Sequence, residues 1–227
     1  MTQIYWRAPL VGADIVNYSA GGPLENAAQQ TGLRDLLAQA AAAARLDHDA
    51  WQVQPSGDGV FAVLPRESDE IALVDGFVRH VNKLLRARDD SMRLRMSIHY
   101  GVLSEGDNGF PGKAPIVSGR LLDARPVRLA IERAPRARLA VLLSDDVYQG
   151  VVANGHTTWE PEDLREVDVS VKSFKGTGWL LMPGIDVQAL DLGEKTGQEN
   201  HHGQRVENVF HGSVQLGDGG VIGIQNR

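Results

Sequence analysis

The sequence contains no cysteine among its 227 residues. Disulfide bonds, cysteine-ligated zinc and thiol catalysis are therefore excluded. It also lacks any continuous apolar run of the roughly 18 residues that a membrane-spanning helix needs. Its first residues do not combine a basic segment with a long apolar one, as a secretory signal does. We therefore expect a cytoplasmic protein with no membrane partner.

An excess of positive charge is also missing. The chain carries 23 Lys and Arg against 29 Asp and Glu, which gives a net charge of -6. General binding to nucleic acid needs a basic face that meets the phosphates, so we expect no nucleic-acid partner. A content of 42% hydrophobic and 23% charged residues is typical of a globular protein that buries a full core.

The most informative stretch that is present runs from Gln54 to Val63, where a tight turn leads into an apolar strand. Asp58 lies between Gly57 and Gly59, and glycine tolerates positive φ and allows close approach of a ligand. A carboxylate held at the tip of a hairpin could bind a cation. An ordinary Ser-Gly-Asp-Gly surface turn explains the same residues equally well when the stretch is taken alone.

A second acid lies upstream in an apolar strand. Asp14 falls within Leu10–Ser19, where the alternation of side chains predicts no charge. A buried charge is unfavourable unless it is paired or binds a metal ion. Asp14 and Asp58 could therefore converge on one or two Mg²⁺ ions, which prefer carboxylate, backbone carbonyl and phosphate oxygens.

Helical and strand patterns alternate along the chain, with two hairpins between them. This order predicts an α+β fold with helices packed on a largely antiparallel sheet. The expected loop is 104–112, and the turn of the last hairpin is expected at 175–178. The expected strands are 4–18, 51–54, 60–64, 93–103, 138–143, 167–174 and 179–182, and the expected helices are 23–45, 71–85, 116–132 and one that begins at the hydroxyl cap Ser144.

The composition changes after Pro183. We expect a folded domain over 1–185, a polar linker over 186–205 and a β-prone tail rich in Gly, Gln and Asn over 206–227. The low charge of the tail suits strand addition or cross-β stacking. A hairpin that docks on the parent domain explains the same pattern.

Six short motifs occur in a fixed order between about Tyr5 and Pro183. They are Asp14-Ile-Val-Asn-Tyr18, Gly57-Asp58, Arg95-Met-Ser-Ile-His-Tyr-Gly101, Ser118-Gly-Arg-Leu121, Leu142-Leu-Ser-Asp-Asp-Val147 and Lys175-Gly176. Together they make this part of the chain resemble the catalytic domain of class III nucleotidyl cyclases, whose fold is a ferredoxin-like α+β arrangement.

The resemblance implies a head-to-tail homodimer with a nucleoside triphosphate in the cleft between the subunits. It also implies formation of a 3′,5′-cyclic nucleotide with Mg²⁺ or Mn²⁺ as cofactor. Asp14, Asp58 and the backbone of Ile15 then correspond to the metal ligands. Arg120 corresponds to the arginine that stabilises the transition state, and Lys175 to a lysine on the triphosphate.

The chain departs from the family at the positions that read the base and place the ribose. Gln54 stands where the family has its purine-selecting lysine, Gly109 where it has the partner acid, and Ile116 where it has the ribose-positioning asparagine. With Gly57, these are the positions that we expect to line the nucleotide. A site without those hydrogen bonds cannot select adenine in the usual way.

Three hypotheses follow. The first is an active cyclase with altered base choice, making cyclic UMP or cyclic CMP, since the chain resembles the pyrimidine cyclases of the bacterial antiphage system called Pycsar. The second is a domain that binds a nucleotide without turnover. The third is a scaffold that recruits an effector protein through the tail, which resembles amyloid-like signalling motifs of bacterial immune-type proteins. The second and third hypotheses are compatible.

Overall fold

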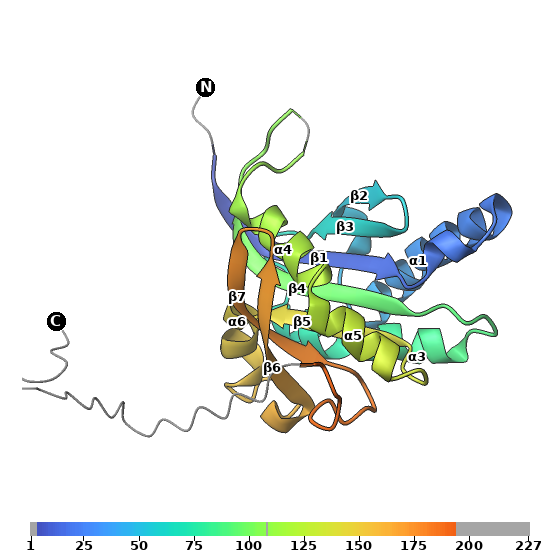
Figure 1. Ribbon diagram of the computed structural model, residues 1–227. Coiled ribbons are helices and arrows are strands. Elements are labelled where there is room, and N and C mark those ends of the chain that lie inside the picture. Colours follow the sequence, from blue (N-terminus) through green and yellow to red (C-terminus); the bar gives the residue numbers. More distant parts are fainter. Residues whose placement is uncertain (1–3, 108, 194–227) are drawn as a thin grey trace, which may run out of the picture. The chain divides into compact units, whose positions relative to one another are not determined.

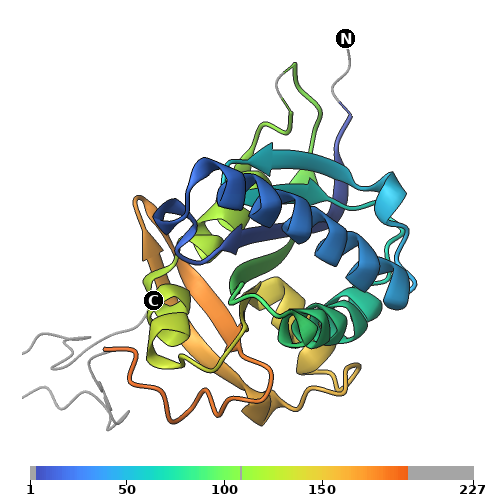
Figure 2. The ribbon, with the colours of Figure 1, turned by 90° about the vertical axis from the view of Figure 1, so that its right-hand side faces the viewer.

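A seven-stranded sheet forms the centre of the computed structural model, which describes residues 4–107 and 109–193. The strand order is β2-β3-β1-β4-β5-β7-β6. The β4–β5 pair is parallel, and the other pairs of neighbouring strands are antiparallel. Figures 1 and 2 show helices on both faces of this sheet. The prediction of an α+β fold with a largely antiparallel sheet flanked by helices is confirmed.

The elements follow one another closely along the chain (Figure 1). The strands are β1 (Trp6–Ile15), β2 (Gln52–Ser56), β3 (Gly59–Val63), β4 (Leu94–Leu103), β5 (Leu139–Ser144), β6 (Leu164–Val171) and β7 (Phe174–Leu181). The helices are α1 (Pro23–Ala43), α2 (Glu70–Ala72), α3 (Val78–Ala87), α4 (Lys113–Leu122), α5 (Arg125–Arg133) and α6 (Asp145–Val147). Two π-helical turns, Leu73–Phe77 and Tyr148–Val152, continue α2 and α6.

One face of the sheet is covered by α1 and α3. Helix α1 buries one stripe, with residues three and four apart that include Leu33, Leu37 and Ala40. This stripe meets Phe77, Val81 and other residues around α3 in the largest apolar cluster. Alanine and leucine favour a helix here, and Leu33, Leu36 and Leu37 lie on the side that faces the core.

Helices α4 and α5 cover the other face, and α4 lies very close to the sheet. A side chain at Gly12 would place its Cβ 2.7 Å from Ser97 Oγ and 3.6 Å from Ser118 Oγ. Ser97 and Ser118 are themselves buried and lie 3.2 Å apart, at hydrogen-bond distance. Small residues on β1, β4 and α4 thus let the helix pack directly onto the strands, and they leave a polar row beneath it.

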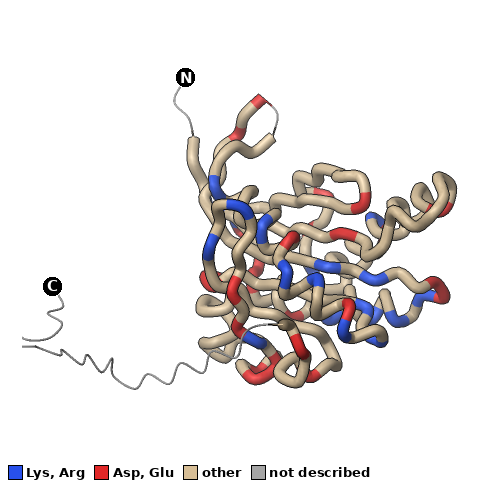
Figure 3. The backbone as a smooth tube through the Cα atoms, in the orientation of Figure 1, with Lys and Arg blue, Asp and Glu red and all other residues tan. Residues whose placement is uncertain are grey.

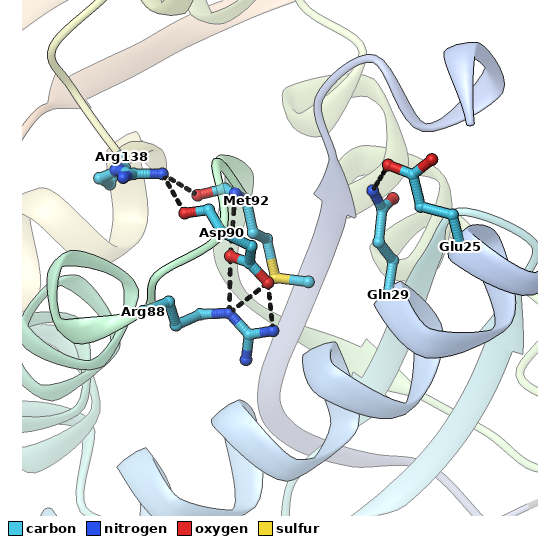
Figure 4. Close-up of polar contacts among 6 residues, drawn as sticks. All are labelled: Glu25, Gln29, Arg88, Asp90, Met92 and Arg138. Carbon is cyan, nitrogen blue, oxygen red and sulfur yellow. Dashed lines mark hydrogen bonds and ion pairs between the residues drawn. The ribbon is translucent and has the colours of Figure 1, made fainter. Parts of the chain in front are cut away.

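Arginines hold the segments that lead into β4 (Figure 4). Arg88 donates to both carboxylate oxygens of Asp90, and Arg138 donates to the carbonyls of Asp90 and Met92. Arg93 donates to three carbonyls at and beyond the end of α5, those of Ile131, Ala134 and Ala137. Of these carbonyls, that of Ile131 lies in the last turn of α5, and the others belong to the segments before β4 and β5. Figure 4 also shows Gln29 donating to Glu25 on α1.

Two expectations about element boundaries are wrong. The helix expected over 116–132 is divided into α4 and α5, because Ala124 is extended and Pro126, which has no N–H to donate, lies in the first turn of the next helix. The last hairpin turns at Lys172, whose φ is 54°, and not at 175–178. Lys175 lies inside β7, opposite Ser170 of β6.

Residues 186–192 continue along the outside of the domain. Val187 and Leu192 are buried, and the Gln188 side chain donates to the carbonyl of Leu164 at 2.8 Å. Arg165 donates to the carbonyl of Leu190 at 2.6 Å. The rest of the expected linker and the expected tail lie outside the described residues, and the domain boundaries stay a prediction.

Charges of both signs are interspersed along the described chain (Figure 3). The expectation that nucleic acid is no partner stays a prediction. No helix among residues 4–107 and 109–193 is long and apolar enough to cross a membrane.

Candidate functional site

A buried ion pair joins β1 and β4 on the face that α4 covers. Asp14 and Arg95 are directly opposite each other in the β1–β4 register. Arg95 donates from Nε to Oδ1 of Asp14 at 2.8 Å and from Nη2 to Oδ2 at 2.7 Å. The Asp14 side chain is only 11% exposed and the Arg95 side chain only 15%. The charge that the strand pattern left unexplained is therefore paired within the chain.

The environment of Asp14 acts on its pKa in two directions. Burial is the largest influence and raises the pKa, while the hydrogen bonds and charge of Arg95 lower it. The negative charges of Asp58 and Asp123 raise it further, and the net result is a raised pKa. The two parallel bonds from Arg95 nevertheless require both oxygens as acceptors, so this geometry holds the ionised form.

The β2–β3 turn brings Asp58 to the same end of β1. The backbone N–H of Ile15 donates to the carbonyl of Asp58 at 2.9 Å. A Cβ at Gly59 would lie 2.3 Å from the carbonyl oxygen of Ala13, so only glycine allows this approach. Gly57 takes φ = 55°, and the Asp58 side chain is exposed. The Ile15 side chain is buried in the core on the α1 side.

These residues do not form a metal site as the chain is folded. Among residues 4–107 and 109–193, no group of three or more His, Cys, Asp or Glu side chains is placed to hold a metal ion. Asp58 is exposed, but both oxygens of Asp14 already accept bonds from Arg95. A divalent ion needs those oxygens as ligands. The donor set therefore does not fit Mg²⁺ or Mn²⁺ while Arg95 occupies it.

Two of the expected nucleotide-lining positions meet beside the loop after β4. A Cβ at Gly109, whose φ is 104°, would lie 2.4 Å from Nε2 of Gln54. Gly106 and Gly109 hold the loop closed through reciprocal backbone bonds of 2.8 and 3.2 Å. A hollow of about 340 Å³ lies here, and its lining includes Gln54, Glu105 and Phe110. It offers an amide, a carboxylate and an aromatic ring to a ligand.

The remaining expected site residues lie elsewhere on the domain. Ile116 and Arg120 are one turn apart on α4; Ile116 is 55% exposed and Arg120 is half-buried. Lys175 alternates with Phe174 and shares its side of β7 with Trp179 and Leu181, which pack into the core on the α1 side. Asp14 faces α4, so Lys175 and Asp14 lie on opposite faces of the sheet.

Two polar features were missed by reasoning from the sequence. Arg95 was noticed only as part of a motif and not as the partner of Asp14; the available signal was one acid and one arginine in neighbouring apolar strands. The other is the contact between Nδ1 of His99 and Oγ of Ser144, which are 3.0 Å apart. Both residues are buried, and burial lowers the pKa of His99, which favours a neutral structural histidine. Ser144 stands at the N-cap of α6 but makes no side-chain capping bond, so the hydroxyl cap expected there is wrong.

No protein-family model matches the chain, and no curated protein sequence matches it. Solved structures do. An adenylate/guanylate cyclase/hydrolase from Silicibacter pomeroyi superposes with a TM-score of 0.57 at 17% identity, over 80% of this chain and 99% of that one. The adenylyl cyclase CyaB from P. aeruginosa gives 0.53 at 13% identity, over 82% and 99%. The guanylate cyclase domain of RhGC from Catenaria anguillulae, in complex with GTP, gives 0.52 at 12% identity, over 78% and 97%.

These similarities define the fold. The described domain folds like the catalytic domains of adenylate and guanylate cyclases, and it spans nearly the whole length of those domains. At such low identity the likeness extends to the fold and not to the individual site residues, which have to be judged by their own geometry.

Proposed function

We propose that this chain is a divergent nucleotidyl cyclase that binds a nucleoside triphosphate between two copies and forms a 3′,5′-cyclic nucleotide. The observation that carries the proposal is the placement of Asp14 and Asp58 at one end of β1 within a cyclase fold. Asp14 is buried and Asp58 beside it is exposed, and carboxylates gathered in this way are typical of functional sites. The structural neighbour from Catenaria anguillulae is described in complex with GTP, which supports a triphosphate as the ligand.

The reaction is an internal displacement. The 3′-oxygen of the ribose attacks the α-phosphorus, the new O3′–P bond forms, and the bond from that phosphorus to the bridging oxygen breaks to release pyrophosphate. The hydroxyl proton passes to solvent. Charge on the phosphate oxygens must be stabilised during this step. In the proposal Arg120 does so with its planar guanidinium, and Lys175 holds the triphosphate as a point charge.

Two copies are needed because one chain does not gather these groups. Lys175 lies on the sheet face opposite Asp14, and α4 presents Ile116 to the outside. An exposed isoleucine one turn from a functional arginine suits a surface that a second copy covers. In a homodimer, the acids of one copy would face Arg120 and Lys175 of the other.

The base is proposed to be a pyrimidine, in bacterial signalling or antiphage defence. The lining of the hollow beside Gln54 and Gly109 includes two side-chain amides, those of Gln52 and Gln54, and each can both donate and accept a hydrogen bond. An amide with Phe110 nearby can read a small ring through its edge and its face. This arrangement replaces the charged pair that selects a purine in the family.

A second candidate is a domain that binds nucleotide without turnover and passes the signal to an effector. Two observations favour it. Arg95 donates hydrogen bonds to both carboxylate oxygens of Asp14, and the apolar Ile116 stands where the ribose would need a polar partner. The tail that would recruit the effector lies outside the described residues, so that role stays a proposal.

A product assay, together with a nucleotide-binding measurement on the same protein, distinguishes the two candidates. Purified protein is given each of the four ribonucleoside triphosphates with Mn²⁺, and cyclic monophosphates are sought by mass spectrometry. The test variant is Asp58→Asn, and Asp49→Asn is a matched control, because both aspartates are exposed near the ends of the same hairpin. A cyclic product that Asp58→Asn loses and Asp49→Asn keeps supports the cyclase. Nucleotide binding without product supports the second candidate, and neither binding nor product contradicts both.

A further inference from the structure

The Asp14–Arg95 pair differs from the Arg88–Asp90 pair, which is also bidentate. Arg88 and Asp90 make the same two-bonded contact, but at the surface, with side-chain exposures of 30% and 47% (Figure 4). Asp14 and Arg95 are enclosed between β1, β4 and α4, and they are 11% and 15% exposed. Surface pairs exchange readily with water and salt, whereas an enclosed pair does not.

Separating Asp14 from Arg95 is unfavourable because it leaves a buried charge without a partner. If Arg95 leaves, Asp14 keeps a buried charge near Asp58 and Asp123, whose charges act against it. If Asp14 is occupied by a cation, Arg95 in turn is left as a buried cation without an anion. Removing one member of a buried pair is strongly unfavourable because the other charge stays uncompensated. Only a ligand that supplies both a cation and an anion, such as a metal-bound triphosphate, restores both partners.

We propose that Arg95 masks Asp14 from divalent cations, so that the nucleotide-free chain does not take a metal ion at this site. The guanidinium occupies both carboxylate oxygens that a metal would need. This proposal deepens the proposed function, since it names the control of the same site. It rests on the proposed function only for the reason why masking is useful. Masking itself can be measured without nucleotide and without turnover.

Neighbouring acids do not offer the metal an alternative of equal strength. Asp58 is exposed, so it presents a single well-hydrated carboxylate. Asp123 is already paired with Arg128 at 2.6 Å. A lone surface carboxylate binds divalent ions weakly, because affinity grows with the number of charged ligands. Strong binding of a divalent ion at this end of β1 therefore requires Asp14 as a ligand.

The test measures Mn²⁺ binding to nucleotide-free, full-length protein at pH 8 by titration calorimetry and by electron paramagnetic resonance of free Mn²⁺. Arg95→Ala removes both donors, and Arg88→Ala is the matched control from the exposed pair. Arg95→Lys keeps a cation but cannot make two parallel bonds. Asp14→Asn, alone and combined with Arg95→Ala, reports whether binding depends on Asp14. Circular dichroism verifies the fold of each variant.

We expect wild type and Asp14→Asn to bind Mn²⁺ equally weakly. Arg95→Ala should bind about tenfold more tightly or better, since charge-assisted hydrogen bonds no longer compete for the carboxylate. The combined variant should lose this gain, and Arg88→Ala should behave as wild type. If Arg95→Ala does not fold, a smaller gain in Arg95→Lys supports the proposal. Asp14-dependent binding in wild type overturns it, as does the absence of any gain in a folded Arg95 variant. Neither result bears on cyclic nucleotide formation.

Discussion

At the residue scale, Asp14 decides how the candidate site behaves. It lies in an apolar strand, is nearly enclosed, and has Arg95 as its partner across the β1–β4 ladder. The two charges depend on each other, because each would be buried alone without the other. This dependence leads to a stability prediction that does not require any ligand.

Asp14→Leu and Arg95→Met, made singly, should each destabilise the domain by about 3 kcal/mol, because each leaves one buried charge unpaired. The double variant should be more stable than either single variant and within about 1 kcal/mol of wild type, since two apolar side chains of similar volume replace the pair. Urea denaturation followed by circular dichroism measures the cycle. Additive losses in the double variant would show that the two side chains do not act as a pair.

Asp14 also marks the limit of reasoning from the sequence at this scale. An acid in an apolar run predicts either a partner charge or a metal ion, and the strand pattern cannot choose between them. The choice depends on which residue of β4 stands opposite, which is set by the register Asp14↔Arg95. Register depends on the whole sheet and is not fixed by the local sequence.

At the scale of elements, the π-helical turn Leu73–Phe77 is fixed from a distant loop. Asp75 accepts a bond from the backbone N–H of Thr158 at 2.9 Å, from its hydroxyl at 2.8 Å and from Arg79 at 2.6 Å. The Arg79 guanidinium lies over the ring of Trp159, and Trp159 Nε1 donates to the carbonyl of Val74. Such turns break the regular helical bonding, so outside partners have to compensate.

This arrangement predicts a pH-dependent loss in Asp75→Asn. Burial acts to raise the pKa of Asp75, but the bonds from Arg79 and Thr158 outweigh it, and the pKa lies below its ordinary value of 3.8. The ionised group therefore stabilises the fold above that value, and this contribution is lost as the pH falls through the lowered pKa.

The Asn variant should be less stable than wild type by about 1 to 2 kcal/mol at pH 7. This difference should persist down to about pH 5 and shrink below the ordinary pKa of an aspartate. Urea denaturation at pH 7, 5 and 3 measures it. A difference that is the same at all three values would contradict the role given to the charge.

Most elements could be predicted from their patterns, and the exceptions have physical causes. The hairpin around Asp58 and the helix from Pro23 follow from glycine, alanine and the spacing of leucines. The turn of the last hairpin was misplaced because Gly176 and Gly178 were taken for turn residues. Gly178 lies within β7, where a Cβ would come within 3.1 Å of Leu142, so the glycine serves packing.

At the scale of the whole molecule, the site residues divide between the two faces of the sheet. Asp14 and Arg95 lie under α4, Ile116 and Arg120 on α4 itself, and Lys175 on the side of β7 that shares the core with α1. The order of the motifs along the chain could suggest the fold, but it could not show this division. The face on which Lys175 lies is determined by the alternation of side chains along β7 and by the packing of the neighbouring β7 residues.

In the proposed dimer the acids of one copy face Arg120 of the other, which makes a complementation experiment the most direct test of a nucleotide site shared by two copies. Asp58→Asn and Arg120→Ala are each inactive in the proposal, but they remove groups that belong to opposite halves of the site. Co-expressed with two different tags, they should form mixed dimers in which one of the two sites is intact. With random pairing, cyclic nucleotide formation should return to about a quarter of the wild-type rate. A mixture that forms mixed dimers but stays as inactive as either variant, while wild type is active, would contradict a site built from two copies.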